Sequence, residues 1–303
     1  MINYYKRTIR DSSIKEIPDI AVGCWINVVN PSSKEIDYLE KRLNLNKRNL
    51  ESGLDQNEIP HLDFNGDNIY FFVKNVPNIE KEEVETFLIV ISNDFILTLS
   101  KTKPYFIENI LRNKINFITT QKLKCLIKIL FFINEGFERL TMNVVKKVQA
   151  SKELTEDLQE KELNNLLKQE SILNTLVSSY YYMNLLYQKT IRRVEFFEQD
   201  KEILEDLIIE ATQGLNLCKS SLKSISNMRD YYVILLSNRL NRIMTIFTVF
   251  TILISIPAAI SGIYGMNIKL PFADEPAIFS YIILLILGIW VVFIVYLKKR
   301  KII

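Results

Sequence analysis

Two uncharged runs near the C-terminus constrain this chain more than any other feature of its sequence. No Asp, Glu, Lys or Arg occurs at 243–268 or 277–297, although charged residues make up 24% of the chain. About 20 consecutive apolar residues span the hydrocarbon core of a bilayer as a helix, and two such runs in succession are atypical of buried core helices. The sequence therefore predicts an integral membrane protein with transmembrane helices at 241–263 and 277–297, joined by an outer loop at 264–276.

Basic residues beside these runs predict the orientation of the chain in the membrane. Arg239 and Arg242 precede the first run, and the tail at 298–303 begins with the letters KKRK. The loop between the runs has a single lysine against the acidic residues Asp274 and Glu275. By the positive-inside rule, both termini lie in the cytosol of a multi-pass protein of the inner or plasma membrane.

Proline positions divide the cytosolic part into two regions. Five prolines fall between positions 18 and 104, and the next one is Pro257. Short runs rich in Val, Ile, Phe and Tyr at 21–29, 68–76 and 86–101, separated by turn residues, predict strands, and the run at 32–45 predicts a helix after serine caps. Residues 1–103 are therefore expected to form a small α+β domain.

Long helices are expected from residue 104 to residue 240. The only glycines of this region are Gly136 and Gly214, and its apolar residues recur at helical spacing. We predict one helix from 122 to 167, a second from 169 to about 200, and a third that starts near Lys201 and continues into the first membrane span. Such a helix is too long to stand alone and needs neighbours to pack against.

Sequence motifs of enzymes are missing from this chain. It contains no glycine-rich nucleotide loop, no HExxH and no G-x-S-x-G, and its one histidine, His61, lies at the apparent start of a strand. Cys24, Cys125 and Cys218 are widely separated without CxxC spacing, which is typical of reduced cytosolic thiols. We expect a protein that is not an enzyme, has no organic cofactor and binds neither nucleotide nor nucleic acid.

Polar residues recur along one face of the first predicted span. Asn241, Thr245, Thr248, Thr251 and Ser255 occupy an arc of roughly 120° at 100° per residue. Single Ser and Thr residues are tolerated in membrane helices because their hydroxyls bond to backbone carbonyls, but five on one stripe favour a water-facing surface. Two spans cannot enclose a pore, so the stripe predicts a homo-oligomer in which several first spans surround an axis and the second spans face lipid.

The tripeptide Gly265-Met266-Asn267 follows the first span directly. With "YGMN" at this position, "CWINV", "PHLDF" and "YFF" in the N-terminal domain, "NRLNRIMTIFTVFTI" entering the membrane and "KKRK" near the end, the sequence resembles the CorA family of divalent-cation channels and transporters over essentially its full length. The resemblance implies an α/β/α sandwich, long stalk helices and two transmembrane helices in a funnel-shaped homopentamer. It further implies conduction of Mg2+, and often of Co2+ and Ni2+, into the cytosol.

The resemblance also implies residue roles in the pore. Gly265, Met266 and Asn267 would form a ring at the outer mouth, where the amide oxygens of Asn267 accept hydrogen bonds from a hydrated Mg2+ ion. Asn241 and Thr248 match polar rings of the family, while Met244 and Phe247 fall where the family narrows the pore, with Phe247 in place of an expected leucine. The full set expected to line the pore is Asn241, Met244, Thr245, Phe247, Thr248, Thr251 and Ser255. In the outer loop, Asp274 and Glu275 are expected to attract cations.

Mg2+ is also expected as a regulatory ligand. In the family, Mg2+ bound between cytosolic subunits favours closure, and the carboxylates that match this arrangement are Asp206 and, nearer the membrane, Asp230. The partner of Asp206 is expected in an acidic run of the N-terminal domain, with the choice left open among Glu80, Glu82, Glu83 and Glu85.

Two alternatives stay open on the sequence. One is a zinc- or cobalt-preferring member of the same superfamily, because ion preference is poorly encoded in sequence. The other is a membrane-anchored helical scaffold or signalling protein, which the polar stripe and the position of the Gly-Met-Asn tripeptide disfavour. Transport would need no ATP, since a membrane potential supplies about 2.3 kcal/mol per elementary charge per 100 mV and about twice that for a divalent cation.

Overall fold

The structure, a computed structural model, describes residues 1–153, 160–268 and 277–299. The chain divides into two compact units, Met1–Met228 and Arg229–Ile303. The first unit contains a seven-stranded sheet and the second contains the two apolar helical segments.

The sheet of the first unit has the strand order β2-β1-β3-β7-β6-β5-β4. β3 and β7 pair in parallel, and every other neighbouring pair is antiparallel. The strands are β1 (Ile2–Lys6), β2 (Lys15–Ile17), β3 (Cys24–Val29), β4 (His61–Asn65), β5 (Asn68–Asn75), β6 (Glu85–Ile91) and β7 (Phe95–Ser100). The sequence analysis identified β3, β5, β6 and β7, but it missed the short strands β1 and β2.

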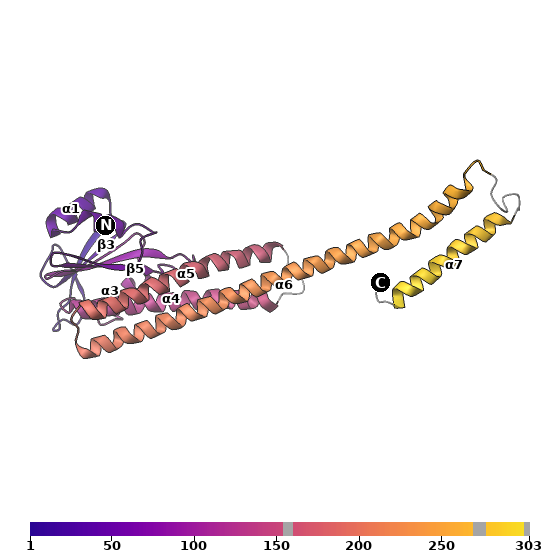
Figure 1. Cartoon of the computed structure of the whole chain (residues 1–303). Helices are drawn as coiled ribbons and strands as arrows, with labels where there is room; N and C mark the ends of the chain where they lie inside the picture. The colour runs from indigo at the N-terminus through magenta and orange to yellow at the C-terminus, as the bar shows by residue number, and fades with distance from the viewer. Residues whose placement is uncertain (154–159, 269–276, 300–303) are drawn as a thin grey trace. The chain divides into compact units, whose positions relative to one another are not determined.

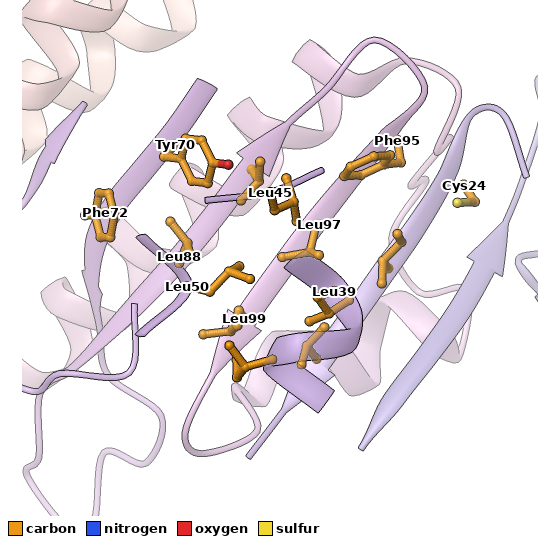
Figure 2. Close-up of a cluster of buried hydrophobic side chains, with 14 residues drawn as sticks. Cys24, Leu39, Leu45, Leu50, Tyr70, Phe72, Leu88, Phe95, Leu97 and Leu99 are labelled. Carbon is orange, nitrogen blue, oxygen red and sulfur yellow. The ribbon is translucent and has the colours of Figure 1, made fainter. Parts of the chain in front are cut away.

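Two short helices, α1 (Ser33–Leu43) and α2 (Lys47–Ser52), cover one face of the sheet (Figure 1). Ser32 begins α1 with a reciprocal capping box to Glu35, as the serine caps predicted. Leu39 of α1 and Leu50 of α2 lie over the leucines of β6 and β7 in an apolar core (Figure 2). Burial of these side chains is the main free-energy gain that holds the two helices on the sheet.

The opposite face is covered by α3 (Tyr105–Leu111) and α4 (Lys122–Glu153) (Figure 1). Phe106 of α3 meets Phe87 of β6 edge to face, with ring centroids 5.9 Å apart. α5 (Glu160–Arg193) lies along the edge strand β4, where Lys189 Nζ donates to the Leu62 carbonyl at 2.9 Å. The helices on both faces confirm the predicted α/β/α sandwich.

One predicted helix boundary is wrong. The sequence analysis ended a helix at 167 and began the next at 169, whereas α5 runs without a break from Glu160 to Arg193. Leu166, Leu173, Leu176 and Tyr180 are buried at helical spacing across the expected boundary. Without a glycine or proline at that point, nothing in the local sequence stops the helix.

A single helix of 67 residues, α6 (Glu198–Tyr264), confirms the predicted continuation into the first span. In the first unit α6 buries Leu204, Leu207, Ala211 and Cys218. In the second unit, α7 (Ile278–Lys299) packs on the last part of α6, and the Trp290 indole donates to the Leu253 carbonyl at 3.1 Å. Both α6 and α7 are long and apolar enough to cross a membrane, which supports the two predicted spans.

Candidate functional site

The predicted polar stripe of α6 lies away from α7 for most of its length. On α6, the half-buried residues include Val249, Leu253, Ile256 and Ile260, and the Leu253 carbonyl accepts from Trp290 of α7. These residues centre roughly 110° around the helix from the stripe. Asn241, Thr248, Thr251 and Ser255 are exposed in the single chain. The contact with α7 at Leu253 therefore lies on a different face of α6 from the polar stripe, most of which stays exposed.

The hydroxyl groups of the stripe share one hydrogen-bonding arrangement. Thr245, Thr248 and Thr251 each donate to the carbonyl four residues earlier at 2.8 Å, and Ser255 donates to the Ile252 carbonyl at 3.1 Å. A hydroxyl has one hydrogen and two lone pairs, so these bonds use the donor and leave the oxygen as an acceptor. A face of acceptors suits a hydrated cation, whose water molecules direct their hydrogens outward.

The residues expected to line the pore differ in how far they are exposed in the single chain. Met244 and Phe247 are 66% and 67% exposed, so α7 covers neither. Thr245 is half-buried and lies at the edge of the stripe, on the side toward Val249 and Leu253. Gly262, which the sequence analysis overlooked, continues the stripe toward the Gly-Met-Asn tripeptide, and an added Cβ there would meet nothing within 4 Å.

The Gly-Met-Asn tripeptide directly follows the C-terminal end of α6. The Gly265 amide donates to the Ser261 carbonyl at 2.9 Å, and the Met266 amide donates to the Ile263 carbonyl at 3.2 Å. These bonds satisfy two of the carbonyls that a helix end leaves open. Asn267 is exposed, so its amide is free to face solvent, whereas Asp274 and Glu275 lie outside the described residues.

The carboxylates expected to bind regulatory Mg2+ fall into two groups. Asp206 and Asp230 on α6, and Glu80 and Glu83 before β6, are exposed. Glu82 and Glu85 are each only 7% exposed, although they belong to the same acidic run. In the described parts of the chain, no three Asp, Glu, His or Cys side chains gather as a metal site.

Glu82 is held by two lysines of the helical layer. Its carboxylate lies 2.6 Å from Lys147 Nζ of α4 and 3.3 Å from Lys168 Nζ of α5, and its side chain is 2% exposed. The backbone of Glu82 is in the left-handed region, with a φ of 57° that is uncommon for a residue other than glycine. These contacts fix the connection between β5 and β6 onto two helices and occupy the carboxylate that the sequence analysis considered as a metal ligand.

We expect Glu82→Gln to lower the free energy of unfolding by about 1–2 kcal/mol. Breaking a fully buried ion pair costs about 3–5 kcal/mol, but both lysines are partly exposed and solvent screens their loss. Thermal unfolding of the detergent-solubilised protein measures the effect. Glu83→Gln, which changes an exposed neighbour, is the control, and equal stability of the two variants would contradict the assigned contacts.

Inside the first unit, α4, α5 and α6 share a buried polar contact. Tyr180 of α5 and Thr141 of α4 bond through their hydroxyls at 3.0 Å, and Cys218 Sγ of α6 lies 3.9 Å from Thr141 Oγ1. Burial raises the pKa of Tyr180 above its usual range and raises the pKa of Cys218 to about 11, so both groups stay neutral at physiological pH. Gly214 makes this contact possible, because a Cβ there would lie 2.4 Å from Tyr180 Cζ.

Comparison with known proteins agrees with this arrangement. The family model described as CorA-like Mg2+ transporter protein matches residues 21–299. The cobalt/magnesium transport protein CorA of Methanocaldococcus jannaschii is 27% identical over 300 residues, which cover 91% of this chain and 90% of that protein.

Solved structures share the complete fold. The complete structure of the CorA magnesium transporter from Methanocaldococcus jannaschii has a TM-score of 0.86 at 22% identity and covers 99% of this chain and 98% of its own. The full-length CmaX protein has a TM-score of 0.74 at 16% identity and covers 98% of this chain and 96% of its own. At these identities the similarity establishes the fold of this chain and does not establish which ion it transports.

Proposed function

The chain belongs to the CorA family of Mg2+ transporter proteins, and from this membership we propose that it forms a homopentameric channel that carries Mg2+ into the cytosol. It is a two-span membrane protein with a cytosolic N-terminal domain, and its family transports Mg2+ and Co2+ rather than catalysing a reaction. The fivefold, funnel-shaped assembly, the inward direction and the preference for Mg2+ are the parts that we propose.

The observation that carries the proposal is the row of acceptor oxygens on α6. Their hydroxyl hydrogens are bonded to the helix backbone, and α7 contacts a different face of the helix at Leu253. A protein that used its spans only as anchors would gain nothing from such a face, because isolated hydroxyls in lipid have no water to bind. Several copies of α6 around one axis would instead offer hydrated cations a continuous path of acceptors.

Asn267 supplies the outer end of this path in our proposal. Mg2+ loses its water reluctantly, so an outer site works best if it binds the hydrated ion through hydrogen bonds. The neutral amide oxygen of Asn267 accepts from these waters without the strong attraction of a carboxylate. Met244 and Phe247 would narrow the same path near its cytosolic end, where Asn241 adds a polar ring.

Flux and mass measurements test the channel proposal. Purified protein in liposomes with a negative interior should admit Mg2+ without ATP, and its mass in detergent should equal five chains. Mg2+ uptake measured in the presence of Co2+, Ni2+ or Zn2+ then gives the order of preference among the ions. This order distinguishes a magnesium channel from a zinc- or cobalt-preferring relative. A monomer or dimer, or liposomes that admit no divalent cation, would refute the proposal and favour an anchored scaffold.

We further propose that Mg2+ bound between subunits closes the channel, with Asp206 as one ligand. Asp206 is exposed on α6, and of the four acidic candidates for its partner only Glu80 and Glu83 are exposed in the single chain. Asp230 would form a second acidic ring nearer the membrane. Glu82 and Glu85 are buried within their own subunit and are poor candidates for a site between subunits.

Replacement of Asp206 by Lys is expected to weaken the protection that Mg2+ gives the cytosolic helices against protease. The lysine places a positive charge where the cation would bind, so a higher Mg2+ concentration would be needed for the same protection. Limited proteolysis across a Mg2+ titration measures this shift. Glu205→Lys, at the exposed neighbouring position, is the control, and an unchanged titration for Asp206→Lys would remove Asp206 from the site.

A further inference from the structure

The first residue of β6 is a buried carboxylate without a positive partner. Glu85 is 7% exposed, and its carboxylate accepts a hydrogen bond from Thr102 Oγ1 at 2.9 Å. In the described ranges, no lysine, arginine or histidine forms an ion pair with it, in contrast to Glu82 three residues earlier. Buried charges in proteins are normally paired or bind metal ions, so we expect a positive charge to lie near the Glu85 carboxylate.

The sheet register places two further polar residues near Glu85, one directly opposite on β5 and one diagonally across on β7. Asn75 pairs directly with Glu85 across β5 and β6, and direct antiparallel partners lie on the same face about 4.5–5.5 Å apart at Cβ. Ser100 pairs with Phe87, which makes it a diagonal neighbour of Glu85 on that face. Asn75 Oδ1 and Ser100 Oγ are both buried, and neither has a hydrogen-bond partner among the described residues.

These side chains share one chemical property, which is that they present oxygen atoms. The Thr102 hydroxyl already donates its hydrogen to Glu85, and the oxygens of all four side chains keep lone pairs that can bind a cation. Hard divalent cations prefer such oxygens, whereas Zn2+ takes nitrogen and sulfur ligands more often. Mg2+ in particular binds through one or two carboxylates and keeps several of its waters.

We propose that Glu85, Asn75, Ser100 and Thr102 form a Mg2+ site within a single subunit. The site does not depend on the pore or on contacts between subunits. Asn75, Glu85 and Ser100 lie at the ends of β5, β6 and β7, and Thr102 follows β7 by two residues. A bound ion would tie these strand ends together beside the β5–β6 connection that Glu82 holds against α4 and α5. Cytosolic Mg2+ would therefore stabilise each subunit by itself, independently of the contacts between subunits.

Mn2+ binding to the full-length protein in detergent tests this site. Mn2+ alone serves as the probe, and the electron paramagnetic resonance signal of free Mn2+ gives the number of ions bound per chain. Glu85→Gln should bind one Mn2+ fewer per chain than the unchanged protein. The control Asp67→Asn, at an exposed acid in the turn between β4 and β5, should bind the full number. A folded Glu85→Gln variant with the full number of ions would overturn the proposal.

Asn75→Asp provides an independent measurement should Glu85→Gln fail to fold. A second carboxylate in a cation site should tighten Mn2+ binding at this site by about tenfold or more, because ligand charge strengthens binding of hard cations. If the Asn75 amide instead donates a hydrogen to Glu85, the aspartate places two carboxylates side by side. The variant would then unfold at a lower temperature with or without Mn2+ and bind it no more tightly, which would also overturn the proposal.

Discussion

Asn267→Ala is expected to reduce Mg2+ uptake into liposomes by about tenfold or more while leaving the protein folded and oligomeric. Asn267 is exposed after the end of α6, so its amide supports no contact that folding requires. In a ring of identical subunits the substitution removes one acceptor from every copy. Each lost hydrogen bond is worth about 0.5–1.5 kcal/mol, and a total of 1.4 kcal/mol already changes an equilibrium tenfold.

Ser261→Ala is the matched control for this measurement. Ser261 is an exposed polar residue near the same end of α6, but it lies on the helix surface well outside the polar stripe. Its flux should equal that of the unchanged protein. If Asn267→Ala transports Mg2+, Co2+, Ni2+ and Zn2+ as the unchanged protein does, then Asn267 is not part of the outer ring. If both variants lose flux equally, the end of α6 acts through its packing rather than through the amide.

Gly214→Ala is expected to lower the free energy of unfolding by about 1–2 kcal/mol, or the unfolding temperature by roughly 4 °C. The new Cβ would lie 2.4 Å from Tyr180 Cζ and 2.6 Å from its hydroxyl oxygen. Tyr180 cannot swing away easily, because it is 3% exposed, bonds to Thr141 and packs on Phe137 with ring centroids 5.3 Å apart. The clash should exceed the gain of about 1 kcal/mol that alanine brings to a helix interior.

Gly136→Ala is the matched control, because it makes the same change within a helix. A Cβ at Gly136 would meet its nearest atom, Tyr105 Cε1, at 3.4 Å, which is ordinary contact. This variant should be as stable as the unchanged protein or more stable. In a Gly214→Ala background, Tyr180→Leu should cost less than it does alone, because the two positions share one contact. Additive effects of the two substitutions would contradict the proposed clash.

Sequence patterns were sufficient for the features of this protein that depend on a single segment. The uncharged runs gave the membrane spans, helical spacing gave the continuation of α6, and the serine caps gave the start of α1. Membership of the family was predictable because its motifs occur in order along the chain. The short elements β1, β2, α2 and α3 were missed, since three to seven residues carry too little periodicity to be recognised.

The sequence by itself determined where the chain crosses the membrane and which face of the first span is polar, because length, charge and helical period are local properties. Only the tertiary structure decided what the individual acidic and polar residues do. Glu82 meets Lys147 and Lys168, Glu85 lies beside Asn75, and Tyr180 rests on Gly214, although each partner is distant in sequence. These pairings depend on strand register and helix packing, which no single segment encodes, and so adjacent glutamates in one acidic run acquire different environments.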